Sequence, residues 1–172
     1  EGLVKTKPLQ GCGYYWLGHG FSPPQPPSSS DEYEALRIAA GYPAYPAEIN
    51  EQYIPLEAGL WDAISFDKGC YIGQEIIARM ESRGRLAKRL VRLRWAGHDD
   101  MPPQAGDRLL HDGQEVGVLT SVSPTGRFAL GYVQTAYAQE GMQLGVARPP
   151  AQLTAQIVGL TPLELPEECP VQ

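Results

Sequence analysis

The sequence has few of the residues from which disulfide frameworks and zinc sites are built. The cysteines are Cys12, Cys70 and Cys169, and the histidines are His19, His98 and His111. No two cysteines form a Cys-x-x-Cys pair, and such sparse, odd usage is typical of a reducing cytoplasm rather than a disulfide-stapled secreted domain. No histidine has zinc-type spacing to a cysteine, so we expect no metal site.

Long apolar runs and a strong positive charge are also lacking. No apolar stretch approaches the roughly 20 residues that a helix needs to cross a bilayer, which argues against a membrane partner. The first ten residues, EGLVKTKPLQ, lack the apolar core of a secretion signal. They also begin without methionine, so we expect a fragment or a processed product, and the cysteine usage leads us to expect a cytoplasmic protein. The net charge of −6 argues against a chain that binds nucleic acid over its whole surface.

Residues 1–87 combine helix and strand signals. Residues 9–17 (LQGCGYYWL) are rich in aromatic side chains and predict a strand, whereas the proline-rich residues 22–30 predict a surface loop. A helix is predicted next, because Ser29 and Glu32 have capping-box spacing and Gly41 is placed to end it. Its expected apolar face consists of Tyr33, Leu36 and Ala40.

Residues 88–172 change to short segments in which apolar and polar residues alternate. The segments are KRLVRLRWA, EVGVLTSVS, FALGYV, MQLGVA and LTAQIV, with DG, PTG and RPP turn signals between them. In the first segment, Val91, Leu93 and Trp95 point one way and arginines the other. About six such strands predict a small antiparallel barrel or sandwich. The predicted fold class is therefore α+β, with domains at 1–87 and 88–172.

Cys70 stands out because of its neighbours. It follows Lys68 and Gly69 and precedes a predicted helix over residues 71–80. A nearby lysine, the positive end of a helix and flanking glycines would all favour the reactive thiolate. However, no histidine adjoins Cys70 as a base, and free cysteines are commonly buried and inert. The residues alone leave two alternatives, a reactive sulfur and a packed core side chain.

The segment KGCYIGQE, residues 68–75, resembles the signature of the YgfZ-type folate-binding family, which is related to the aminomethyltransferase (T-protein) of the glycine cleavage system. Further similar stretches are LRIAAGYP at 36–43, IPLEAGL at 54–60, IIAR at 76–79 and GVLTSVSPTGRFALGYV at 117–133. The resemblance implies a T-protein-like α+β folate-binding region, partial in this chain, followed by a β-barrel.

The resemblance also implies a function. Family members bind tetrahydrofolate and support the maturation or repair of iron–sulfur enzymes, including one that modifies tRNA. We therefore expect folate as the cofactor and iron–sulfur enzymes as partners. Cys70 maps onto the motif cysteine and is the expected catalytic residue, which T-proteins typically lack. The expected cofactor-binding residues are Arg37, Glu57, Lys68, Tyr71, Gln74, Glu75 and Arg79, although Gln74 and Glu75 are also candidates for bracing the loop and Tyr71 for packing it.

The chain departs from the family pattern in two ways. Family members begin well before the segment at residue 36, so we expect part of the folate pocket to be missing from this chain. The family's Arg-Ile-Glu-Ala-Gly reads Arg37-Ile38-Ala39-Ala40-Gly41 here. Ala39 therefore replaces the glutamate that recognises the pterin, whose paired N–H groups suit a carboxylate. Glu48 and Glu57 are candidate substitutes.

Two other functions remain open from the sequence. The first is an aminomethyltransferase that transfers a one-carbon unit to tetrahydrofolate, although the chain is aminomethyltransferase-like rather than an expected active T-protein. The second is a noncatalytic module that binds RNA or protein through the basic residues 83–94, which hold six of the 14 lysines and arginines. For that stretch the alternative is the solvated face of a strand.

Overall fold

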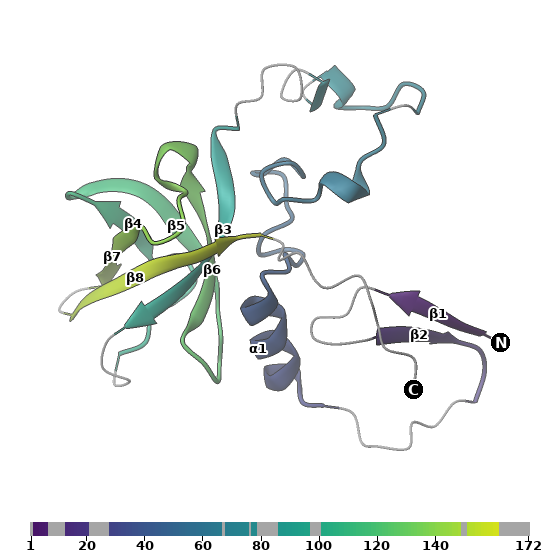
Figure 1. The fold of residues 1–172 in the computed structure, drawn as a ribbon, viewed down its shortest axis with the longest axis horizontal. Coiled ribbons are helices and arrows are strands. Elements are labelled where there is room, and N and C mark those ends of the chain that lie inside the picture. Colours follow the sequence, from purple (N-terminus) through teal and green to yellow (C-terminus); the bar gives the residue numbers. More distant parts are fainter. Residues whose placement is uncertain are drawn as a thin grey trace.

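The computed structural model describes residues 2–6, 13–20, 28–66, 68–75, 77–78, 86–96, 101–148 and 151–161. Its first elements are strands β1 (Gly2–Thr6) and β2 (Gly13–Leu17) and helix α1 (Ser30–Ala40). The remaining strands are β3 (Lys88–Ala96), β4 (Arg108–His111), β5 (Gln114–Val122), β6 (Phe128–Gln134), β7 (Gln143–Arg148) and β8 (Ala151–Leu160). Short 3-10 turns lie at Trp61–Ala63 and Thr135–Tyr137. Figure 1 shows helix α1 between the barrel and the β1–β2 hairpin.

Strands β3 to β8 form a closed antiparallel barrel in the order β3-β6-β5-β4-β7-β8. The ring closes because β3 pairs with β6 on one side and with β8 on the other. A closed ring is a barrel rather than a sandwich, so the α+β class with a small antiparallel barrel is confirmed. The predicted strand at 9–17 is present as β2, antiparallel to β1, over the part that the structure describes.

Strand β4 was not among the segments that alternation identified, because four residues are too few to show a period. Its turn was visible, however. Asp112 and Gly113 join β4 to β5 with φ angles of 49° and 78°. Positive φ at both central residues matches the right-handed twist of a two-residue hairpin, for which Asp-Gly is a preferred pair. The DG signal therefore marked the end of a strand as well as the start of one.

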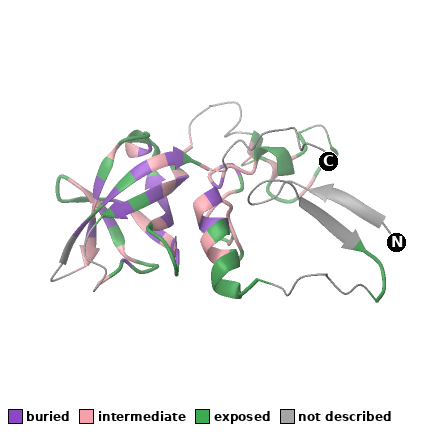
Figure 2. Ribbon diagram, turned by 60° about the horizontal axis from the view of Figure 1, so that its bottom comes forward, coloured by how far each residue is buried: buried purple, intermediate pink, exposed green. Residues whose placement is uncertain are grey.

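The barrel is filled by the inward residues of its strands. Val91, Leu93 and Trp95 of β3 are all buried, as their alternation predicted. They belong to one apolar cluster whose other main members are Leu109, Val116, Leu119, Val133, Leu144, Val146, Leu153 and Ile157. Burial of this apolar surface is the main force that holds the barrel together. Figure 2 shows the buried residues concentrated in the barrel and on one side of helix α1.

Helix α1 begins and ends where the sequence predicted. The Ser29 side chain accepts a hydrogen bond from the Glu32 N–H (3.2 Å), and the Glu32 carboxylate accepts one from the Ser29 N–H (2.9 Å). Gly41 ends the helix with a φ of 79°, a left-handed conformation that glycine adopts without strain.

The buried face of α1 is only in part the predicted one, since Ala40 is buried as expected. Tyr33 and Leu36 are 55% and 41% exposed, whereas Ile38 is 1% exposed and packs with Leu90, Leu130 and Tyr132 on the outside of the barrel. The prediction failed at Tyr33 and Leu36 because an arginine, Arg37, lies on the buried side and interrupts the apolar pattern. Helix α1 and the barrel share this second cluster, so residues before and after position 87 pack against each other. The domain boundary at residue 87 stays a prediction.

A buried ion pair joins α1 to the barrel. The Arg37 guanidinium donates to the Glu48 carboxylate (3.1 Å), to the Tyr42 carbonyl (2.7 Å) and to the Ser121 hydroxyl on β5 (3.0 Å). Glu34 completes its partners. Burial lowers the pKa of Arg37, but its hydrogen bonds to and charge interactions with Glu34 and Glu48 outweigh that effect, so the net shift is upward. Arg37 therefore stays charged.

Glu48 is 0% exposed and uses both carboxylate oxygens. One accepts from Arg37 and from the Ala44 N–H (3.0 Å), and the other accepts from the Ser121 hydroxyl (2.6 Å). Its backbone carbonyl accepts from the Tyr132 hydroxyl on β6 (2.9 Å). A buried charge is tolerated only with such complete pairing.

We expect Glu48→Gln to lower the free energy of unfolding by about 3 kcal/mol, because it leaves the buried Arg37 guanidinium without its fully buried counter-charge. Glu34→Gln is the matched control. It removes the other carboxylate partner of Arg37, but Glu34 is 40% exposed, so the expected loss is about 1 kcal/mol or less. Urea unfolding of both variants checks the difference, and equal losses would contradict the central role of Glu48.

We also expect stability to fall with pH above about 10, in part through Tyr132. Burial, and then the negative charge of Glu48, raises the pKa of Tyr132 in the folded chain. The unfolded chain therefore loses this proton at lower pH, and stability declines by about 1.4 kcal/mol per pH unit for this group until the folded-state pKa is reached. Tyr132→Phe should be less stable at neutral pH but should show a shallower decline above pH 10 in urea unfolding. An unchanged slope would contradict this assignment.

Candidate functional site

The segment that carries Cys70 projects from the packed part of the chain. It follows the turn at Trp61–Ala63 and extends away from the barrel in Figure 1. Cys70 is exposed and in no disulfide, so the alternative of a packed core cysteine is excluded. Helical residues follow at 74, 75, 77 and 78; Ile76 and residues 79–80 of the predicted helix lie outside the described residues. The sulfur is thus open to a partner molecule.

The residues around Cys70 brace one another. The Lys68 ammonium lies 4.6 Å from the centroid of the Tyr71 ring, a cation–π contact. The Tyr71 N–H donates to the Gln74 side-chain oxygen (3.4 Å), and the Gln74 N–H donates to the Tyr71 carbonyl (3.2 Å). Gln74 therefore closes the turn that presents Cys70. Glu75 is exposed one residue further on.

Glu57 lies at the start of the barrel rather than beside Cys70. Its carboxylate accepts from the Lys88 N–H (3.3 Å) and the Ile54 N–H (3.4 Å), and its carbonyl accepts from the Leu90 N–H (2.8 Å). Glu57 thus ties the loop before the Cys70 segment to the first residues of β3. Its carboxylate faces backbone donors in this arrangement.

The other predicted cofactor-binding residues fall into two groups. Arg37 is buried and binds Glu34, Glu48, Tyr42 and Ser121, so it anchors helix α1 rather than facing an open surface. Arg79 lies outside the described residues. The structure therefore brings Lys68, Cys70, Tyr71, Gln74 and Glu75 together on one exposed segment and separates them from Arg37 and Glu57.

Part of the basic stretch 83–94 also has a structural role. Arg92 donates to the Ala39 carbonyl at the end of α1 (2.6 Å) and to the Val158 carbonyl (3.4 Å). Burial lowers the pKa of Arg92, with the charge of Glu140 opposing the shift. Arg92 therefore fits neither alternative for the basic stretch, since it is neither part of an open anion site nor on a solvated strand face. Arg83 and Arg85 lie outside the described residues.

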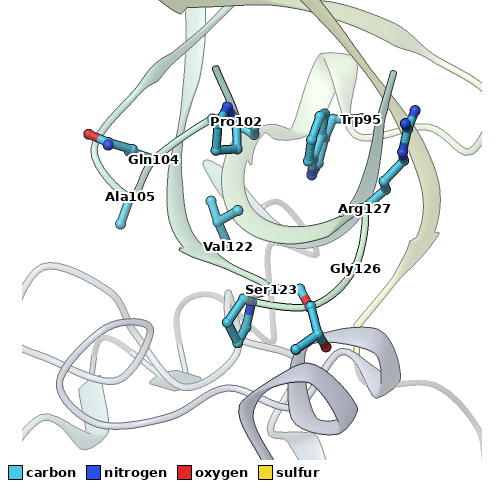
Figure 3. Close-up of a pocket in the computed structure, with 11 residues that line it drawn as sticks. Trp95, Pro102, Gln104, Ala105, Val122, Ser123, Gly126 and Arg127 are labelled. Atoms are coloured by element: carbon cyan, nitrogen blue, oxygen red, sulfur yellow. The ribbon is translucent and has the colours of Figure 1, made fainter. Parts of the chain in front are cut away.

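The sequence reasoning missed two features. One is the role of Glu48, whose partners on β5 and β6 are more than 70 residues away along the chain. The other is a hollow of about 660 Å³ at one end of the barrel, formed by the end of β3, the segment before β4 and the β5–β6 turn. Figure 3 shows the labelled residues around it. The Pro-Pro pair at 102–103 and the PTG turn were the available signals.

Two further observations concern metal-ligating clusters and membrane-spanning helices. In the described part of the chain, no three His, Cys, Asp or Glu residues gather as metal ligands would. Within the same residues, no helix combines the length and the apolar character needed to cross a bilayer.

Comparisons with known proteins relate this chain to the glycine cleavage T-proteins and the YgfZ proteins. Residues 88–163 match the family described as the glycine cleavage T-protein C-terminal barrel domain. A chloroplastic transferase-like protein of Arabidopsis thaliana is 36% identical over 76% of this chain and 30% of its own length. An aminomethyltransferase of Caldanaerobacter subterraneus is 35% identical over 73% of this chain and 34% of its own length. The tRNA-modifying protein YgfZ of Sodalis glossinidius is 44% identical over 48% of this chain and 25% of its own length.

The solved structures show the same fold. The aminomethyltransferase T of the Bartonella henselae glycine cleavage system superposes with a TM-score of 0.65 at 24% identity, over 76% of this chain and 38% of that one. Fold and matches together define a chain with a T-protein-type barrel. The fold and the matches make this chain similar to the YgfZ proteins and the glycine cleavage T-proteins, and residues 88–163 match the barrel domain of the latter. It spans between a quarter and about a third of the length of these curated relatives.

We expect Cys70 to be alkylated by iodoacetamide in the folded chain, because its sulfur is exposed. Mass spectrometry of the native, alkylated chain should show the modification on Cys70 at a rate similar to that in urea. Cys70→Ser, which loses only the sulfur, is the matched control. Modification that appears only in urea would contradict the exposed position.

Proposed function

We propose that this chain acts within a folate-binding protein of the YgfZ kind that supports the maturation or repair of iron–sulfur enzymes, including tRNA-modifying ones. The observation that carries the proposal is the exposed Cys70 on the braced segment 68–75. The YgfZ relative, named for tRNA modification, supports the choice. The sparse cysteines are consistent with work in the reducing cytoplasm.

The described residues alone do not make a pterin site. Ala39 stands where the family glutamate is expected, and of the two candidate substitutes Glu48 is enclosed and fully paired. Glu57 is turned to the backbone donors at the start of β3. We therefore assign no step to folate, and we propose that residues 36–80 supply only one wall of its site, with Lys68, Tyr71, Gln74 and Glu75 at the edge. Tetrahydrofolate remains a proposed ligand of the whole protein.

The chemistry available to this chain lies in the thiol of Cys70. The thiolate form of this sulfur would be a ligand for an iron ion of a client enzyme. The neighbouring Lys68 ammonium would attract a negatively charged partner surface, and the Tyr71–Gln74 hydrogen bonds hold the loop in place. An exposed position suits a site that must meet another protein.

We expect Cys70→Ala to lose the ability to restore iron–sulfur enzyme activity in a bacterial strain that lacks its YgfZ protein. Cys70→Ser should fail as well, because a hydroxyl is a poor ligand for iron compared with a thiolate. Cys169→Ala removes a cysteine outside the motif and should leave complementation intact. The readout is the activity of an iron–sulfur enzyme in cell extracts, with equal protein levels verified by immunoblot.

A second candidate function is the transfer of a one-carbon unit to tetrahydrofolate, which the name of the Caldanaerobacter relative supports. Full complementation by Cys70→Ala would overturn the role of the thiol. Measuring methylene transfer from the lipoyl carrier protein to tetrahydrofolate would then test the aminomethyltransferase alternative, in which Cys70 has no part.

A further inference from the structure

The hollow at the end of the barrel has the volume of a small-molecule site. Its volume of about 660 Å³ lies within the range of known ligand pockets. Much of its lining is apolar, from three prolines, Ala105, Val122 and the ring of Trp95. The polar side chains are few, and Arg127 is the one charged residue among those that line it. None of these residues belongs to the Cys70 segment.

Trp95 is the residue that most directly indicates a ligand. It is 5% exposed, and among the described residues its indole N–H has no hydrogen-bond acceptor. A buried donor without an acceptor costs about 1–3 kcal/mol, so such a group is uncommon in a folded chain. In Figure 3 the indole nitrogen lies on the edge of the ring that faces Val122, Ser123 and Gly126. Trp95 thus lies at the boundary between the barrel core and the hollow.

The surroundings of Trp95 hold its ring in place. The backbone N–H of Trp95 donates to the Arg127 carbonyl (3.0 Å), and the Arg127 guanidinium lies 5.5 Å from the ring centroid. Figure 3 shows the ring between Pro102 and Arg127, with Gln104 and Ala105 on the far side of the hollow. A ligand here would meet the edge of a fixed ring that carries an unpaired donor.

We propose that this hollow binds a small organic molecule with a flat apolar body and a carbonyl or carboxylate oxygen that accepts the Trp95 indole hydrogen bond. The apolar body follows from the proline, valine and indole lining, and the acceptor follows from the unpaired N–H. The site is independent of the folate proposal, because it uses only residues of the barrel end.

The test uses the 172-residue chain labelled with 15N at the indole nitrogens of its three tryptophans, Trp16, Trp61 and Trp95. The probes are 2-naphthoate, 2-naphthamide, 2-methylnaphthalene and 2-naphthylmethylammonium. We expect a saturable shift of the Trp95 indole N–H resonance with the acid or the amide, and none with the hydrocarbon or the ammonium compound. If both 2-naphthoate and 2-naphthamide shift the resonance, a carbonyl oxygen is sufficient as the acceptor. If only 2-naphthoate does, the negative charge of the carboxylate is needed.

Three variants separate binding from folding. Trp95→Phe keeps an aromatic ring but removes the donor, and should weaken binding about three- to tenfold, the loss of one hydrogen bond. Trp61→Phe changes an exposed tryptophan outside the hollow and should bind normally. Ala105→Trp, at an exposed lining position, should fill the hollow and abolish binding without disturbing the core. Thermal melts confirm that each variant is folded.

Several results would overturn the proposal. These are the absence of a saturable Trp95 shift with either acceptor probe up to its solubility limit, equal affinity in folded Trp95→Phe, and equal binding of 2-methylnaphthalene. Undiminished binding by Ala105→Trp would also overturn it, because it would place the probe elsewhere on the chain. None of these readouts involves Cys70 or folate, so failure here leaves the proposed function untouched.

Discussion

The arrangement of this chain depends on one buried carboxylate. Glu48 accepts hydrogen bonds from Arg37 of the helix, from Ala44 of the loop and from Ser121 of the barrel, and its carbonyl accepts one from Tyr132. A buried ion pair adds little net stability, since desolvation of the two charges offsets their attraction. Its effect here is to specify the geometry, because any other placement of α1 on the barrel would leave a charge buried without a partner.

That constraint determines where the rest of the first region lies. With α1 fixed, Arg92 reaches the Ala39 carbonyl, and Ile38 packs against Leu90, Leu130 and Tyr132. The loop that follows is then tied to β3 through Glu57. The stretches at 36–43 and 54–60, similar to a ligand-binding family, are thus partly architectural in this chain. The segment beyond them leaves the packed region, and the exposed thiol follows from that departure.

The two candidate sites have opposite physical character. Around Cys70 the side chains are exposed, and the segment is braced by its own hydrogen bonds and a cation–π contact. Such a site suits an encounter with another protein. At the barrel end, Trp95 is enclosed, its indole donor is unpaired among the described residues, and it borders a partly apolar hollow. A site of this kind selects a small molecule by shape and by one hydrogen bond.

Local interactions account for what the residues alone predicted. The capping box at Ser29 and Glu32, the glycine at the end of α1, the alternation along β3 and the Asp-Gly turn each involve residues only a few positions apart. The motif around Cys70 was likewise readable, including the bracing by Gln74, because its contacts lie within a few residues. Alternation left barrel and sandwich both open, since neither the ring closure nor the pairing order is written in any one strand.

The sequence by itself therefore determined most of the elements and their class, and it singled out the short segment around Cys70, whose exposure the structure then showed. Only the tertiary structure decided that Arg37 and Glu48 are anchors, that the inward face of α1 carries Ile38, and that Trp95 borders a hollow. The physical reason is distance along the chain. Arg37 meets Ser121 and Glu48 meets Tyr132 across 84 residues, and no local pattern encodes a contact that exists only once the barrel has closed.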